Sequence, residues 1–143
     1  MAVLRDLAPL RSRGVRHDHA DRLTRLDVPA ALRTDLGCDA VGVPARHGFR
    51  LLVRTPSAGC VFADSAWWWW IVPAGSDLEL AWPFPSHYAP GARVPAADAR
   101  LIRRPAGPSP YTPPIPLYLM ICQLTGTEPR WPAGVGGPGR ETV

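Results

Sequence analysis

The sequence predicts an α+β fold in which an antiparallel β-meander carries two or three short helices. Segments in which apolar and polar residues alternate, as in half-buried strands, gather between residues 39 and 82. Helical spacing of leucines is found mainly before residue 37. The chain also contains 18 prolines and 13 glycines, which favour turns and extended segments over long helices.

The composition predicts one globular domain, because 46% of the 143 residues are hydrophobic and only 20% are charged. We expect residues 1–16 to form a flexible or helical arm and residues 17–126 to form the α+β domain. The glycine-rich residues 127–143 are expected to be a disordered tail. Within the domain, residues 105–116 contain six prolines, which predicts an extended segment without regular structure.

Two helices are predicted in the N-terminal part of the domain. Asp18 can cap a helix that carries leucines such as Leu26 on one face. Pro29 suits the first turn of a second helix, and Gly37 suits its left-handed end. Residues 45–54 fit both a strand and a helix, and we favour the helix as the third of the fold.

The predicted strands are residues 39–44, 60–63, 67–72, 78–82 and 92–95. The first of them ends at Pro44, which places it at or near a sheet edge. Asp64 is expected to close a hairpin between the second and third strands. Residues 117–124 are predicted to return to the core as a short helix or strand.

Residues 67–70 are four consecutive tryptophans. Because side chains alternate along a strand, Trp67 and Trp69 should face one side, and Trp68 and Trp70 the other. One pair is expected in the core. For the other, three interpretations stay open: cover by residues 105–116, contact with a partner protein, or a cage for a small ligand. The candidate binding residues are the aromatic side chains on and near this strand, namely Trp67, Trp68, Trp69, Trp70, Trp82 and Tyr111.

The net charge of +4 lies in the first part of the chain. Residues 1–54 hold ten arginines and six aspartates, whereas no arginine occurs between Thr55 and Ala92. The tryptophan strand is therefore not favoured as a stacking groove for nucleic acid. The arginines of residues 5–25 leave one alternative open, a nucleic-acid-associated accessory protein.

Catalytic and metal-binding patterns are weak. Asp39 and Asp64 would support a third alternative, a small metal-assisted enzyme, only if the fold brought them together. Local turn and capping roles are favoured for both. His17 and His19 diverge on a helix, so they cannot hold one ion there. We predict no catalytic residue, no metal ligand and no cofactor.

Cys38, Cys60 and Cys122 are odd in number and lack the spacing of metal ligands, which indicates reduced thiols in a cytoplasmic protein. The longest apolar run, residues 115–122, is too short to cross a bilayer. No membrane partner is therefore expected.

Three short patterns resemble those of short actinobacterial proteins of unassigned function. They are Asp39-Ala40-Val41-x-Val43-Pro44, Gly59-Cys60-Val61-x-Ala63-Asp64 and Trp70-Ile71-Val72-Pro73-Ala74-Gly75-Ser76. The resemblance covers residues 39 to about 100 and implies a compact α+β module without an assigned activity. The four-tryptophan run and residues 105–116 depart from this pattern.

These observations predict a non-enzymatic binding or regulatory module that acts through protein–protein contacts. The expected contact surface is aromatic and proline-rich. The expected partner is another protein or a second copy of the chain.

Overall fold

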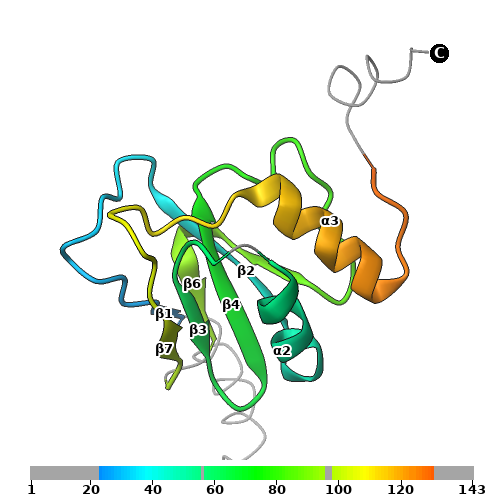
Figure 1. Cartoon of the computed structure of the whole chain (residues 1–143), viewed down its shortest axis with the longest axis horizontal. Helices are drawn as coiled ribbons and strands as arrows, with labels where there is room; N and C mark the ends of the chain where they lie inside the picture. The colour runs from blue at the N-terminus through cyan, green and yellow to red at the C-terminus, as the bar shows by residue number, and fades with distance from the viewer. Residues whose placement is uncertain (1–22, 56, 96–97, 131–143) are drawn as a thin grey trace, which may run out of the picture.

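The computed structural model describes residues 23–55, 57–95 and 98–130, and these form an α+β fold, as predicted. Its main sheet has five antiparallel strands in the order β5-β2-β4-β3-β7 (Figure 1). These strands are β2 (Cys38–Pro44), β3 (Val61–Ala63), β4 (Trp67–Pro73), β5 (His87–Ala89) and β7 (Arg100–Arg103). The tryptophan strand β4 is central, and it pairs with β2 along the whole length of both strands.

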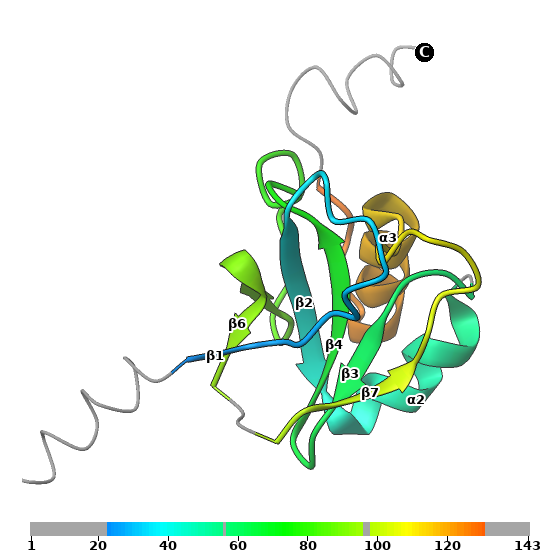
Figure 2. The same ribbon diagram turned by 90° about the vertical axis from the view of Figure 1, so that its left-hand side faces the viewer.

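The two faces of the sheet have different covers (Figure 2). Two helices, α2 (Ala45–Arg54) and α3 (Pro114–Thr125), pack on one face. The chain from Leu26 to Leu32 covers the other face together with a small sheet of β1 (Thr24–Arg25) and β6 (Arg93–Val94). A 3-10 turn, η1 (Pro90–Ala92), leads from β5 into β6.

Several predicted elements are confirmed. Residues 45–54 are helical, β3 and β4 form the expected hairpin, and β6 lies within the predicted segment 92–95. Residues 117–124 belong to helix α3. β2 lies one strand from the sheet edge, which agrees with its proline end.

The two N-terminal helices were predicted wrongly where the structure describes that part of the chain. Residues 24–25 form a short strand, and no helix occurs between 23 and 37. Leu26 does not lie on a helix face, because its backbone N–H donates to the Ala92 carbonyl and its side chain joins the core. Gly37 does have the expected left-handed conformation, with φ of 74°. Asp18 and the arm 1–16 lie outside the described residues.

The predicted strand 78–82 is also wrong, because the chain leaves the sheet after Pro73. A turn closed by the Leu78 N–H and the Gly75 carbonyl redirects it, and residues 74–86 form a loop. Leu80 is buried against α3. The apolar residue Leu80 is therefore buried by a helix and not by the sheet. The next strand after this loop is β5, which pairs with β2.

Residues 105–113 have no regular secondary structure, but α3 begins at Pro114 and includes Pro116. The expectation that this whole segment lacks regular structure was therefore wrong. Proline is accepted in the first helical turn, since the N–H groups there have no carbonyl partner within the helix. At its other end α3 stops at Gly126, which has φ of 69°.

Thr127 to Arg130 have defined positions, although the sequence predicted a disordered tail from residue 127. The Arg130 N–H donates to the Tyr118 hydroxyl at 2.7 Å, which brings this segment back along α3. Residues 131–143 lie outside the described part of the chain.

Candidate functional site

The four tryptophans divide between the two faces of the sheet, as predicted. Trp67 and Trp69 stack on each other with ring centroids 5.6 Å apart, and Trp68 and Trp70 stack at 6.4 Å. The two pairs are buried to a similar extent, because each lies in a hydrophobic cluster on its own face of the sheet. Trp69 is 1% exposed and Trp70 is fully buried. A partner protein can reach at most the half-buried Trp67 and Trp68 without opening the core.

Residues 105–116 cover only part of the tryptophan strand. The Pro110 carbonyl accepts the Cys60 N–H at 2.8 Å, and the Thr112 N–H donates to the Ile71 carbonyl at 2.8 Å. These bonds fix the segment beside the ends of β3 and β4. Tyr111 packs against the cluster that contains Trp69, and its hydroxyl accepts the Leu36 N–H at 3.1 Å. Tyr111 thus acts as internal cover for one tryptophan pair.

Trp82 lies in the loop that follows the tryptophan strand and packs against the hydrophobic cluster that contains Trp70. Its ring contacts Tyr88 and, edge to face, Tyr118 on α3. Its indole N–H donates to the Ser76 carbonyl at 3.2 Å. Because Trp82 is only half-buried, it supports the loop and keeps part of its ring at the surface.

A groove of about 260 Å³ separates the loop after β4 from the beginning of α3. We call it the α3 groove. Its apolar lining residues are Pro73, Ala74, Leu78, Leu80, Pro114 and Ile115. Leu78 is 80% exposed and Ile115 is 49% exposed, so large apolar side chains stand at its mouth. Leu119, one turn after Ile115 on α3, is also exposed.

The charge at the α3 groove is negative. Glu79 lines the groove, and the neighbouring Asp77 is exposed. None of the residues that line it is an arginine. Sequence reasoning missed Leu78 and Ile115 as surface residues, because Leu78 matched a strand pattern and Ile115 followed two prolines.

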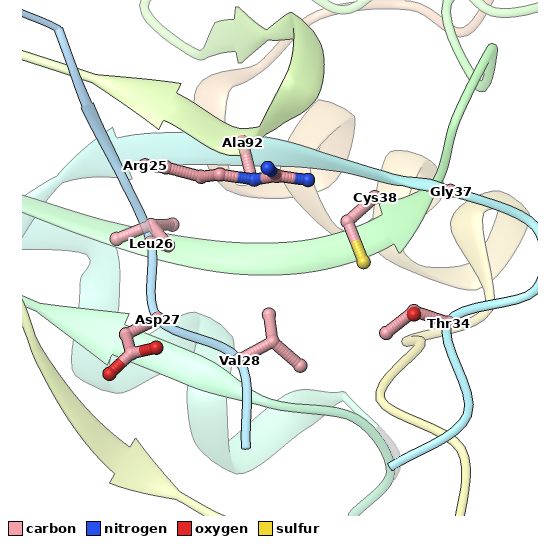
Figure 3. A pocket seen from close by; sticks show the side chains of 8 residues that line it. All are labelled: Arg25, Leu26, Asp27, Val28, Thr34, Gly37, Cys38 and Ala92. Atoms are coloured by element: carbon pink, nitrogen blue, oxygen red, sulfur yellow. The ribbon is translucent and has the colours of Figure 1, made fainter. Parts of the chain in front are cut away.

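A second pocket, of about 320 Å³, lies beside β1 (Figure 3). Arg25 extends across it, and the Cys38 thiol points into it. Burial raises the pKa of Cys38, although a Tyr111 hydrogen bond and the Arg25 charge act in the opposite direction. The thiol therefore stays protonated near neutral pH, and the pocket offers no activated nucleophile.

Asp39 and Asp64 do not meet, which removes the geometry that a shared metal or acid–base site would need. Asp39 lies opposite Val72, at one end of β4, whereas Asp64 accepts the Trp67 N–H at the other end. The five residue steps from Trp67 to Val72 span about 16 Å of strand. Each carboxylate has the local role that the sequence favoured: Asp64 closes the hairpin and Asp39 holds turns.

Clusters of metal-ligating side chains and membrane-spanning helices are both absent from residues 23–55, 57–95 and 98–130. No group of three His, Cys, Asp or Glu side chains there could hold an ion. No helix of that part is long and apolar enough to span a membrane. His17 and His19 lie outside the described residues.

No family model, no curated protein and no solved structure matches this chain. The resemblance of residues 39 to about 100 to short actinobacterial proteins therefore stays a prediction.

Proposed function

We propose that the protein is a non-enzymatic binding module whose contact surface is the α3 groove. The observation that carries this proposal is the exposure of Leu78 and Ile115 on opposite sides of one apolar groove. Large apolar side chains that gather at an exposed surface are typical of protein contact sites. The prolines around the groove keep its walls in place without a large entropic cost on binding.

The chemistry of the groove favours a short apolar segment of another protein with a basic residue beside it. A volume of about 260 Å³ accommodates one or two large side chains rather than a whole domain face. Glu79 and Asp77 at its edge attract a positive charge and repel acidic segments. A second copy of the chain is the other occupant that the sequence left open.

One tryptophan, Trp82, supports this surface. Trp82 holds the loop against α3 through Tyr118 and Ser76, so the loop keeps Leu78 at the groove. Trp69 and Trp70 are not part of the proposed surface, because they are buried. We propose a cytoplasmic location, because Cys38, Cys60 and Cys122 are all free thiols.

Selection of peptides from a random display library on the immobilised full chain tests the proposal. We expect enriched peptides to combine apolar residues with arginine or lysine. Their binding should weaken at least tenfold in the Leu78→Asp and Ile115→Asp variants. Leu36→Asp is the matched control, because Leu36 is similarly exposed but lies outside the groove.

Peptides that bind all three variants equally well, or the lack of any enrichment, would contradict a peptide-binding role for the groove. Light scattering measures the mass of the wild type in solution and so tests whether a second copy of the chain occupies the groove. A dimer that dissociates in Leu78→Asp and persists in Leu36→Asp would identify a second copy as the partner.

A further inference from the structure

The outward face of α2 combines exposed apolar and positively charged side chains. Phe49 is 64% exposed and Val53 is 61% exposed, although both are large and apolar. The helix buries Gly48 and Leu51 against the sheet, so its attachment does not use Phe49 or Val53. In Figures 1 and 2, α2 lies at the periphery of the molecule.

The charged residues of this face form a regular row. Arg46, Arg50 and Arg54 are four residues apart, so they follow one another along the helix with a rise of about 6 Å each. Phe49 and Val53 form a second row beside them with the same spacing. We call this surface the α2 arginine row.

Within the described part of the chain, no acidic side chain is paired with the arginines of this row. Helix α2 contains three arginines and no acidic residue. No hydrogen bond or ion pair of these three guanidinium groups is found within the described residues. The pKa of His47 on the same helix is lowered by burial and then by the charges of Arg46 and Arg50, which is consistent with a positive field at this end of α2.

We propose that the α2 arginine row binds single-stranded nucleic acid, with the arginines on successive phosphates and the Phe49 ring stacked on a base. An exposed aromatic ring beside a row of cations is the usual combination in surfaces that hold unpaired bases. A duplex keeps its bases stacked inside and would leave Phe49 unused. This surface is separate from the α3 groove and its occupant, so the proposal does not depend on the protein-binding role.

Two other occupants are less well matched. One phenylalanine and one valine offer little apolar area for insertion into a lipid surface. An acidic peptide would satisfy the arginines but has no need of a flat exposed ring. Both become outcomes of the experiment.

Fluorescence anisotropy of the full chain with labelled dT20 and U20 oligonucleotides, at 50 and 200 mM NaCl, tests this inference. With three phosphate contacts we expect a salt slope of about −2 and therefore roughly 16-fold weaker binding at the higher salt. Arg50→Ala should reduce the magnitude of the slope by about 0.7. Phe49→Leu should weaken binding about tenfold without changing the slope, whereas Phe49→Tyr should bind as the wild type does.

Three controls make the result specific. Arg33→Ala removes an exposed arginine outside α2 and should change nothing. A variant with Arg11, Arg13 and Arg16 changed to alanine tests the arginines near the N-terminus. Leu78→Asp tests whether the α3 groove contributes. Far-ultraviolet circular dichroism confirms that each variant is folded.

The inference is overturned if neither oligonucleotide binds at 50 mM NaCl, or if only the N-terminal arginine variant reduces binding. It is also overturned if phosphatidylglycerol vesicles or a glutamate-rich peptide bind more tightly than the oligonucleotides. Equal affinities of Phe49→Leu and the wild type would contradict the proposed stacking of the Phe49 ring on a base.

Discussion

Asp39 joins three parts of the chain that are far apart in the sequence. Its carboxylate accepts the Gly75 N–H at 2.9 Å, the Gly91 N–H at 2.7 Å and the Tyr88 hydroxyl at 2.5 Å. The side chain is only 6% exposed, so these bonds replace the water that it has lost. Burial, and then the hydrogen bond and charge of Asp39, raise the pKa of Tyr88.

We predict that Asp39→Asn lowers the free energy of unfolding by about 2 kcal/mol or more. The amide would point an N–H at one of the three donors, and the charge that strengthens the remaining bonds would be lost. Urea denaturation followed by circular dichroism measures this effect. Asp98→Asn, at an exposed position, is the control and should change stability by less than about 0.5 kcal/mol. A similar small change in both variants would contradict the structural role of Asp39.

Two glycines make room for the tryptophans. A Cβ on Gly42 would lie 2.5 Å from the Trp69 ring, and one on Gly48 would lie 2.3 Å from the Trp68 ring. Real Cβ contacts do not approach this closely, so each indole lies directly on the backbone of a neighbouring element. The sequence did not reveal this pairing, because Gly48 is twenty residues away from Trp68.

At the scale of elements, the contact of Gly48 with Trp68 fixes α2 on the sheet. Alanine has a helix propensity about 1 kcal/mol more favourable than glycine, so an isolated helix would gain from Gly48→Ala. In the folded protein we predict the opposite, a loss of about 1–3 kcal/mol, because the methyl group would displace the indole.

Thermal unfolding monitored by circular dichroism checks this prediction. The double variant Gly48→Ala with Trp68→Leu should be less destabilised than the sum of the two single variants, because the smaller side chain leaves space for the methyl group. Additive losses would show that the clash does not determine how α2 packs.

Another feature at the scale of elements is that the edge strand β7 is protected against pairing with a second chain. β7 is an edge strand of only four residues, it carries arginine at both ends, and its pairing with β3 is interrupted by a bulge. Short charged edge strands with bulges discourage pairing with a second chain. The α3 groove and the α2 arginine row are therefore better candidates for contact than the β7 edge of the sheet.

For the molecule as a whole, buried ionisable groups predict a loss of stability at alkaline pH. Burial raises the pKa of Cys60 to about 11, and burial also raises the pKa of Cys38 and Cys122. A thiol whose pKa is higher in the folded state stabilises the fold fully below its unfolded pKa. That contribution is lost as the pH rises through the folded pKa.

We therefore expect the midpoint of thermal unfolding to fall between pH 9 and pH 11, measured under reducing conditions by differential scanning fluorimetry. Cys60→Ala should be less stable than the wild type at pH 7, because it leaves a small cavity. Its further decline between pH 9 and pH 11 should be smaller than that of the wild type. Parallel declines would show that Cys60 does not contribute to the pH dependence.

The local part of the fold followed from short-range patterns. Alternation placed Trp67 and Trp69 opposite Trp68 and Trp70, and Asp64 closed its hairpin through bonds to the next few residues. Gly37 adopted the left-handed conformation that its position suggested. Each of these features depends on neighbours within a few positions, and such neighbours are visible in the sequence.

Contacts between distant segments were decided only by the tertiary structure. Leu78 and Leu80 alternate as in a strand, yet the chain turned away and packed Leu80 on α3. Both neighbouring places beside β4 are taken, by β2 and β3, and α3 offers an apolar face. The N-terminal leucines matched a helix, yet Leu26 entered the core from a strand-like segment. The partners of Asp39 and the exposure of Leu78, Ile115 and Phe49 likewise depend on which elements compete for the same surface. The sequence by itself thus determined the fold class and the two-sided tryptophan strand, whereas long-range packing decided which side chains were left at the surface.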